Sequence, residues 1–220
     1  FNPSESDVNC QDGDYDFYNL QRTSNGRAVV LRRDFMHASP YIDVDTIDNL
    51  IIITRGPLIP AISKLTHEQA VAMMVLGQAM ESSAGDPTKA GTIRSEFFYD
   101  PFVAGDLAEH ANTFYEIISN LPHINFYLLN TGGIGEGEHY RDIRLEHTMG
   151  ILDSLLRGGL EDWKESPAGF QVPAAIRVVD DIYLHPEKLY STADFEEKQQ
   201  ELDKIRYQAV AKLGNNLHAS

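Results

Sequence analysis

The sequence has very little cysteine: Cys10 is the only one in 220 residues. An intrachain disulfide and a cysteine metal cluster are therefore excluded, and a reducing cytoplasm is the compartment we expect. Basic residues are also scarce, since 18 Lys and Arg stand against 33 Asp and Glu, giving a formal net charge of −15. A protein that neutralises the phosphates of a nucleic acid needs clustered cations, so we expect no nucleic-acid partner.

Long apolar runs are missing as well. A membrane-spanning helix needs about 18 or more consecutive apolar residues, and no such run occurs. We therefore expect no membrane partner, and we identify no secretory leader. The apolar content of 42% is nevertheless enough for a proper core. Because the chain begins at Phe1 without an initiator methionine, we expect a fragment of a longer protein.

The stretch 124–156 organises the rest of the sequence. Residues 124–129 are branched or aromatic and predict a strand, and Asn130 with the glycines after it ends that strand. Residues 145–156 predict a helix that Gly158 and Gly159 close. Its expected apolar stripe consists of Leu145, Met149, Leu152, Leu155 and Leu156.

Similar patterns predict the remaining elements. The capping box that starts at Thr66 predicts a helix with an apolar face, and residues 107–121 and 193–213 predict two more, the last one charged and solvated. Leu107, Ala111, Phe114, Ile117 and Ile118 are expected to face inward. Apolar runs predict strands at 28–33, 41–44, 50–54 and 176–179, the third of them buried on both faces.

Strands and helices alternate, which predicts an α/β fold with a mixed sheet flanked by helices. Residues 1–16 are polar and acidic and are expected to form a lead-in without order of its own. Residues 17–220 are expected to form a single domain. Within it, the polar loop 82–92 has the length of a ligand-covering segment, and the aromatic residues at 97–102 are assigned to the core.

The loop after the central strand is a candidate ligand site, because backbone amides at such a position can approach an anion closely. Its Gly-x-Gly at 135–137 lacks the third glycine of a dinucleotide fingerprint, so a flexible connection without a ligand is the alternative. Acids and histidines crowd the same region without a recognisable ligand spacing, and we predict no metal site in this chain. They are Glu136, Glu138, His139, Asp142, Glu146 and His147.

Two arginines occupy positions suited to binding an anion. Arg27 follows a polar turn directly before a predicted strand, and Arg55 directly follows the strand at 50–54. A guanidinium there can bind a phosphate or carboxylate through two hydrogen bonds. The alternative for each is an ordinary surface arginine.

Several of these segments together resemble the C-terminal part of the ATP-type phosphoenolpyruvate carboxykinases. PAISKLTHEQ at 60–69 is similar to the family's "PPVSKLTPEQ", and NTG at 130–132 is similar to its "NTGW". LEHTMGILDSLL at 145–156 resembles its "IKDTRAIIDAIL" helix, and NGR at 25–27 resembles its "NTR". The resemblance runs from about residue 16 to the C terminus, in the family's order and spacing.

The resemblance implies the C-terminal, nucleotide-binding half of a carboxykinase-like fold. The family uses ATP and a divalent metal, Mg or Mn, to decarboxylate oxaloacetate and phosphorylate the enolate. It implies a catalytic role for Arg27, which matches the arginine that bridges substrate and terminal phosphate. It implies nucleotide binding by Thr148 and Arg141, with Asn25 as a neighbour of the site. The phosphate loop and the metal ligands precede this region in the family, so the expected partners are the N-terminal half of the same protein, a nucleotide and a small dicarboxylic or keto acid.

The sequence also departs from the family pattern. A lysine-arginine pair before the nucleotide helix corresponds here to Arg141 and Asp142, so an acid replaces one cation. Gly133 stands where the family has tryptophan, and the acidic loop 134–139 is longer. We therefore consider a divergent phosphotransferase and, as alternatives, a catalytically inactive binding or regulatory module with this fold and a free-standing acidic interaction domain.

Overall fold

The structure, a computed structural model, describes residues 9–11, 14–16, 31–80, 93–95 and 104–211. By its contacts the chain divides into two units, Phe1–Thr46 with Met80–Arg94 and Ile47–Ala79 with Ser95–Ser220. In the first unit, β1 (Asn9–Gln11) pairs antiparallel with β2 (Asp14–Asp16), and η1 (Arg32–Asp34) is a short 3-10 helix. The strands β5 (Gln78–Met80) and β6 (Ile93–Ser95) form a two-stranded sheet. The division at residue 16 stays a prediction.

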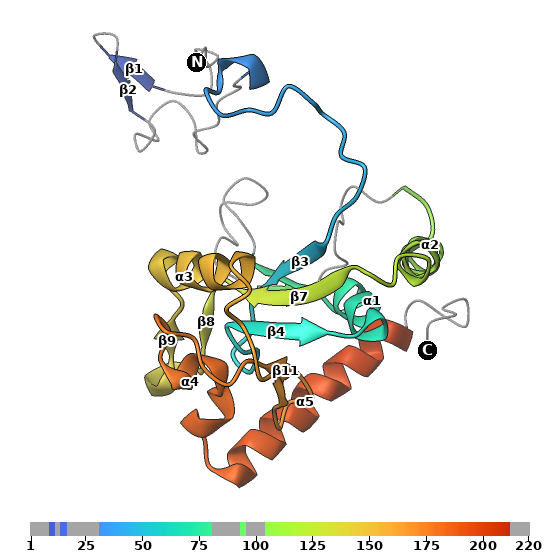
Figure 1. The fold of residues 1–220 in the computed structure, drawn as a ribbon. Coiled ribbons are helices and arrows are strands. Elements are labelled where there is room, and N and C mark those ends of the chain that lie inside the picture. The colour runs from blue at the N-terminus through green and yellow to red at the C-terminus, as the bar shows by residue number, and fades with distance from the viewer. Residues whose placement is uncertain (1–8, 12–13, 17–30, 81–92, 96–103, 212–220) are drawn as a thin grey trace. The chain divides into compact units, whose positions relative to one another are not determined.

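The second unit is built on a five-stranded mixed sheet with the order β10-β11-β4-β7-β3 (Figure 1). Its central strand β7 (Asn125–Asn130) runs parallel to β3 (Asn49–Thr54) and antiparallel to β4 (Ile62–Leu65). The short strands β11 (Gln171–Val172) and β10 (Lys164–Glu165) extend the sheet beyond β4.

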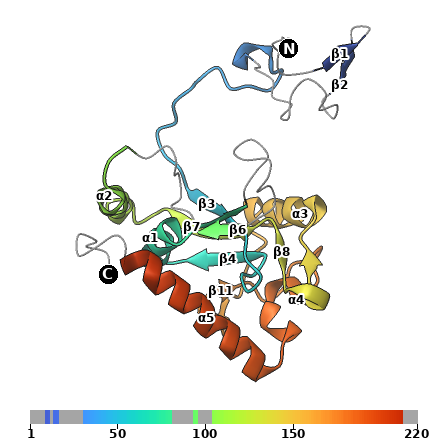
Figure 2. The same cartoon turned by 180° about the vertical axis from the view of Figure 1, so that it is seen from behind.

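Two helices cover one face of this sheet, α1 (His67–Val75) and α2 (Leu107–Ser119). Because side chains alternate along a strand, Phe126 and Leu128 of β7 point to this face, where Met74 of α1 and Ile118 of α2 are also buried. Seen from behind, α5 (Thr192–Ala211) runs past α1 (Figure 2). Its Val210 packs against the same core.

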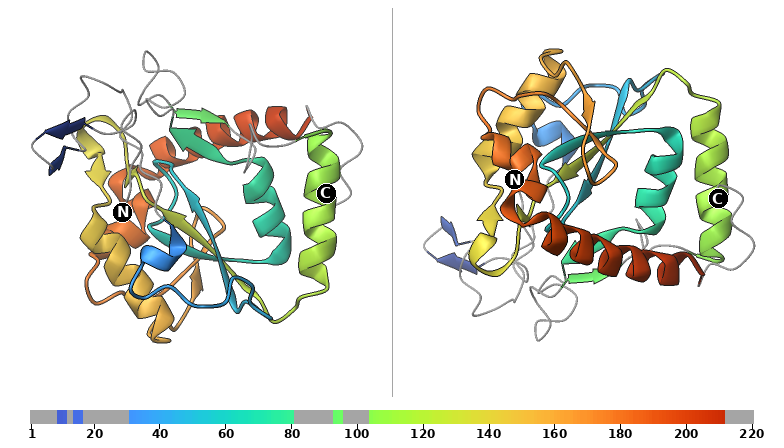
Figure 3. Two further views of the ribbon diagram at one scale, coloured as in Figure 1. Left: turned by 90° about the horizontal axis from the view of Figure 1, so that it is seen from above. Right: turned by 90° about the horizontal axis from the view of Figure 1, so that it is seen from below.

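The opposite face is covered by α3 (Leu145–Leu156) and α4 (Asp181–Leu184). Tyr127 and Leu129 of β7 point this way and pack with Ile151 of α3 and Leu184 of α4. Views from above and below show the strands running between the two groups of helices (Figure 3). The predicted α/β class with a mixed sheet flanked by helices is confirmed.

The local predictions agree best where a helix signal is explicit. Thr66 closes a capping box with Gln69, whose side chain and backbone exchange hydrogen bonds of 3.0 and 3.2 Å with it. The helix at 145–156 has the predicted bounds, and its end is sealed by Gly159 N donating to Ser154 O at 2.8 Å. Gly158 there has φ +67°, a conformation that suits glycine. The strands at 50–54 and 124–129 are also confirmed.

Four strand predictions need correction. Arg32 and Arg33 form a 3-10 turn instead of the strand predicted at 28–33, whose first three residues lie outside the described part. Residues 41–44 form no strand, and 176–179 form only an isolated bridge between Ile176 and Val179. β3 is not buried on both faces, because it lies at the edge of the sheet and leaves Ile53 65% exposed.

Two helix faces also differ from the prediction. Ile117 of α2 is 53% exposed instead of facing inward. In α3, Leu145, Met149 and Leu156 are exposed, whereas Ile151, which was not assigned to the stripe, is fully buried. Leu152 and Leu155 lie between these extremes and pack against the core. Segments 82–92 and 97–102, predicted as a ligand-covering loop and a core cluster, lie outside the described residues.

Candidate functional site

The carboxyl ends of two neighbouring parallel strands meet at one point of the second unit. Thr54 of β3 is in register with Asn130 of β7, and Thr131 N donates to Thr54 O at 3.1 Å. The loops that follow both strands therefore start side by side. In open α/β sheets this arrangement is the usual location of a ligand, because loops and helix starts converge there. It is the candidate site of this chain.

Asn130 holds the two loops together. It is fully buried, and its side-chain Nδ2 lies 3.0 Å from Gly56 O, 2.8 Å from Ile59 O and 3.2 Å from Gly133 O. An amide nitrogen has two hydrogens, so these three carbonyls share them. Its Oδ1 accepts from Gly132 N at 3.1 Å. The loop after β3 and the loop after β7 thus form one hydrogen-bonded unit.

The side chain of Arg55 lies against Gly132 of this unit. Its side-chain stem passes so close to Gly132 that a Cβ added there would lie 3.0 Å from Arg55 Cγ. The glycine therefore lets the arginine lie flat over the backbone. An arginine that follows a strand at the carboxyl ends of parallel strands is suited to bind an anion such as phosphate. The anion-binding role of Arg55 stays a prediction.

Tyr140 and Asp142 form a hydrogen-bonded pair next to Gly133. Tyr140 Oη donates to Asp142 Oδ1 at 3.3 Å, and the ring lies against Gly133, whose added Cβ would be 2.5 Å from Tyr140 Cε2. Burial, and then the negative charge of Asp142, raise the pKa of Tyr140, while the positive charge of Arg55 acts in the opposite direction. The Asp142 carboxylate and the Arg55 guanidinium therefore both act on the same phenol.

The side chain of Arg141, a predicted nucleotide-binding residue, donates hydrogen bonds to carbonyls of its own loop. It lies in β9 (Arg141–Asp142), which pairs with β8 (Gly133–Ile134), and it is exposed. Its Nη1 donates to Glu138 O at 3.2 Å and to Tyr140 O at 2.9 Å. These bonds occupy donors on one side of the guanidinium and help to fix the loop.

Thr148 lies in the first turn of α3 and is half-buried. The helix begins after Arg144, whose carbonyl accepts from Thr148 N at 3.2 Å and whose own amide donates to His147 Nδ1 at 3.3 Å. The start of α3 is joined to the loop unit by Ile143 N donating to Gly132 O at 3.0 Å. Thr148 and the loop after β7 therefore belong to one connected region. Asn25 and Arg27, the other two predicted site residues, lie outside the described residues.

Several acids and histidines of the central region contact different neighbours. Glu136 pairs with Lys198, and Glu146 pairs with Arg144 at 3.0 Å. The His139 ring packs on Tyr190 and the His147 ring on Tyr183, with centroids 5.7 and 4.7 Å apart. In the part of the chain that the structure describes, no group of three or more potential ligands is placed to hold a metal ion.

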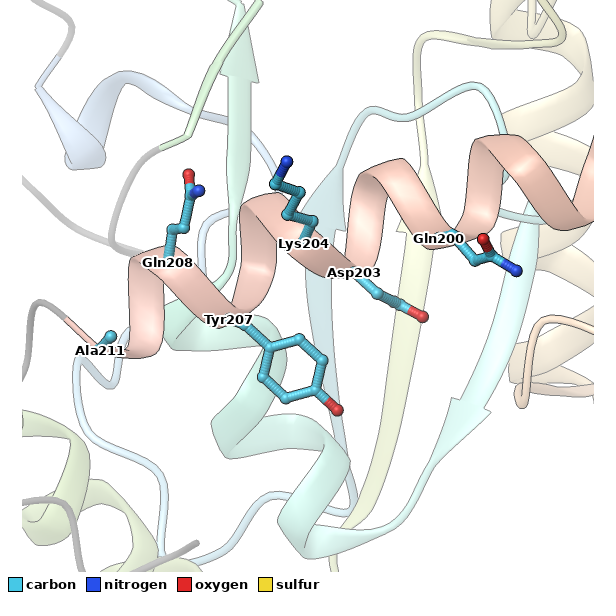
Figure 4. A pocket seen from close by; sticks show the side chains of 6 residues that line it. All are labelled: Gln200, Asp203, Lys204, Tyr207, Gln208 and Ala211. Carbon is cyan, nitrogen blue, oxygen red and sulfur yellow. The ribbon is translucent and has the colours of Figure 1, made fainter.

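Apart from this candidate site, a hollow of about 560 Å³ lies along α5 (Figure 4). The described residues that line it all belong to this helix, and Tyr207 among them is 77% exposed. A binding site normally has polar groups that converge from several elements, which this helix face does not provide. Its lining residues are Gln200, Asp203, Lys204, Tyr207, Gln208 and Ala211.

Sequence reasoning missed the most connected residue of the site. Asn130 was interpreted only as a turn former, although a lone amide that ends a buried strand is a signal for a side chain that satisfies loop carbonyls. It also missed Lys198 and Tyr190, which contact the loop from about sixty residues further along the chain. Nothing in the local sequence around them predicts that contact.

The fold and the site define a mixed α/β domain with a polar site at the carboxyl ends of adjacent parallel strands. The family model for phosphoenolpyruvate carboxykinase matches residues 6–182, and the chain belongs to the ATP-type family of these enzymes. No helix among the described residues is long and apolar enough to cross a membrane.

Curated relatives show the same relationship. The chain is 32% identical over 190 residues to a phosphoenolpyruvate carboxykinase (ATP) of Aeropyrum pernix, covering 84% of this chain and 37% of the relative. A protein of that name from Emericella nidulans is 31% identical over 71% of the chain and 28% of its own length. One from Allorhizobium ampelinum is 26% identical over 80% and 34%. The chain thus spans about a third of the length of these relatives.

Proposed function

We propose that this chain forms the nucleotide-side domain of an ATP-dependent carboxykinase. In the complete protein, oxaloacetate or a related keto or dicarboxylic acid is decarboxylated and phosphorylated. The observation that carries the proposal is the connected region formed by Arg55, the loop after β7 and the first turn of α3 at the carboxyl ends of β3 and β7. Membership of the carboxykinase family supports it.

In this reaction these residues would position the phosphate and neutralise its charge. Phosphoryl transfer places negative charge on the phosphate oxygens, and fixed cations and amides stabilise that charge. Arg55 is a cation whose side-chain stem lies against Gly132 of this loop. Thr148 contributes a hydroxyl beside the start of α3, where the helix dipole favours an anion. By the family resemblance, Arg27 acts at the terminal phosphate, with Asn25 as a neighbour of the site.

The metal belongs to another part of the proposed enzyme. A divalent Mg or Mn ion, when bound, would neutralise negative charge on the phosphate groups. Among the described residues no group of three or more potential ligands is placed to hold this ion, so the donor set here does not fit it. We assign its ligands to the N-terminal half of the same protein, which is also the expected partner of this domain.

A second candidate function is a binding or regulatory module without catalysis. The observation that favours it is the pair Arg141 and Asp142. The guanidinium of Arg141 bonds to two carbonyls of its own loop, and Asp142 adds a negative charge where a nucleotide phosphate would need a positive one. Weak nucleotide affinity is the consequence that this candidate predicts.

Calorimetric titration of the complete protein with Mg·ATP distinguishes these functions. For the nucleotide-side domain we expect saturable binding that Thr148→Val weakens about two- to tenfold, as for the loss of one hydrogen bond. Arg27→Ala and Arg55→Ala are expected to weaken it further, because each removes a cation near phosphate. Thr113→Val, the same change at an exposed position of α2, is the matched control.

The same titration has two adverse outcomes. Unchanged, tight binding in the Thr148, Arg27 and Arg55 variants removes those residues from the site. The absence of Mg·ATP binding by the wild-type protein overturns the carboxykinase proposal and leaves the binding module.

A further inference from the structure

The acidic loop at residues 134–139, which contains η2 (Gly137–His139), contacts a distant segment of the chain. Lys198, in the first half of α5, forms an ion pair with Glu136 of this loop. The same ammonium lies 5.5 Å from the centre of the Tyr190 ring, a cation–π distance. Tyr190 also packs on the His139 ring. One lysine and one tyrosine thus contact the loop at Glu136 and at His139.

The loop is held on its other side by backbone contacts. Gly135 N donates to Pro57 O at 2.8 Å, which joins the loop to the segment after β3. Gly135 has φ +71°, and an added Cβ would lie 2.4 Å from His139 O and 2.8 Å from Leu189 Cδ1. Only glycine fits this close approach. The loop is therefore fixed at Gly135, and the Lys198 contact fixes the residue that follows.

A cavity of about 470 Å³ lies where α5 and the loop meet. Four carboxylates line it, from Glu136, Asp194, Glu197 and Glu201. Lys198 is the cation among them, and its hydrogen bond to Glu136 raises the pKa of the Lys198 ammonium. The lysine is therefore charged throughout the neutral range. It neutralises part of the repulsion that would otherwise separate the loop from the helix.

The position of the loop affects the candidate site, because residues of the site directly follow the loop in the sequence. The loop connects β8 to β9, and it is followed directly by Tyr140, Arg141 and Asp142. Arg141 is also bonded back to Glu138 O within the loop. A displacement of Glu136 and His139 would therefore move the tyrosine and the acid relative to Arg55.

We propose that Lys198 is a positioning residue for the candidate site. Through Glu136 and Tyr190 it fixes the acidic loop, and through the loop it sets where Tyr140, Arg141 and Asp142 lie. Exposed ion pairs contribute little to global stability, so its effect is local order instead of overall folding. For nucleotide affinity, the inference rests on the proposed function.

Hydrogen exchange of the loop amides tests the contact itself. In the full chain, Lys198→Met is expected to speed amide exchange of residues 135–142 about two- to fivefold, because one exposed ion pair no longer resists opening. The exchange of β7 and α1 amides should stay unchanged. Lys204→Met is the matched control, since it removes the same charge from the same helix at a position facing the other hollow.

A double variant makes the test specific for the pair. Glu136→Gln should speed exchange as Lys198→Met does, and the double variant should be no faster than the faster single one. Equal acceleration by Lys204→Met, additive effects in the double variant, or an unchanged loop in Lys198→Met each overturn the proposal.

Mg·ATP titration of the same variants separates this inference from the proposed function. If both hold, Lys198→Met weakens nucleotide binding and Lys204→Met does not. A faster loop with unaltered nucleotide affinity contradicts the positioning role. Absence of nucleotide binding by the wild-type protein counts against the proposed function, while the exchange data still decide whether Lys198 fixes the loop.

Discussion

The side-chain amide of Asn130 lies 3.0 Å from the carbonyl oxygen of Gly56, seventy-four residues earlier in the sequence. This bond joins the loop after β7 to the loop after β3. The same amide also faces the carbonyls of Ile59 and Gly133. A fully buried asparagine therefore replaces the water that these loop carbonyls would otherwise need.

Replacement of Asn130 by alanine should be strongly destabilising. Asn130→Ala removes the side-chain partner of three loop carbonyls and of the Gly132 amide, and we expect a loss of about 2–4 kcal/mol in the free energy of unfolding. Urea unfolding followed by circular dichroism measures it. Asn120→Ala removes an exposed asparagine at the end of α2 and should cost much less. Similar losses for both variants would show that the buried hydrogen bonds do not hold the loops.

The sequence predicted the elements whose signals are local. A capping box at Thr66, an apolar run at 124–129 and glycines after residue 156 each depend on neighbouring residues, and all three appear in the structure. The α/β class follows from their alternation. The comparisons confirm the family that the resemblance indicated.

The burial of individual side chains could not be predicted as well, because it depends on which other elements pack against a strand or helix. β3 is a branched, apolar run, but its place at the edge of the sheet exposes Ile53. α3 is apolar on two sides, and the sequence alone does not say which side faces the sheet. The Asn130 and Lys198 contacts are non-local as well, since each joins segments more than sixty residues apart.

The two sides of α3 give the next prediction. Ile151 is fully buried whereas Leu156 is 77% exposed. Ile151→Ala should cost about 2–4 kcal/mol through lost burial and a cavity, and Leu156→Ala should change stability by no more than about 0.5 kcal/mol. Thermal unfolding of the two variants compares them directly. A larger cost for Leu156 would restore the stripe predicted from the sequence as the buried side.

The phenol of Tyr140 should report the charge of Asp142. Burial and the Asp142 carboxylate raise its pKa above the ordinary value of about 10. Asp142→Asn removes that charge, so the pKa should fall. A raised folded-state pKa stabilises the fold below the unfolded value and loses this contribution as the pH rises through the folded value. In Asp142→Asn the loss should begin at the same unfolded-state value, but it should be smaller and should end at a lower pH, because the folded-state pKa is lower.

NMR of ¹³C-labelled tyrosine measures this titration, with Tyr140→Phe to assign the signal. An identical Tyr140 pKa in wild type and Asp142→Asn would mean that the carboxylate does not act on the phenol.

Gly133 should be intolerant of even a methyl group. Its Cβ would lie 2.5 Å from Tyr140 Cε2, so Gly133→Ala forces the tyrosine ring away from the loop. We expect a changed chemical shift for Tyr140 and a loss of about 1–3 kcal/mol in stability. Gly137→Ala provides a contrast in space, since no atom lies within 4 Å of an added Cβ there, although its φ of +54° still strains the backbone. An undisturbed Tyr140 signal in Gly133→Ala would contradict the ring's position.

The central claim is that the region joining Arg55, the loop after β7 and the start of α3 binds a nucleotide. The most direct measurement is calorimetric titration of Mg·ATP into the complete wild-type protein, Thr148→Val and the surface control Thr113→Val. We predict saturable binding that is weakened about two- to tenfold in Thr148→Val and unchanged in Thr113→Val. No binding by the wild-type protein, or equal affinity in all three, would contradict the claim.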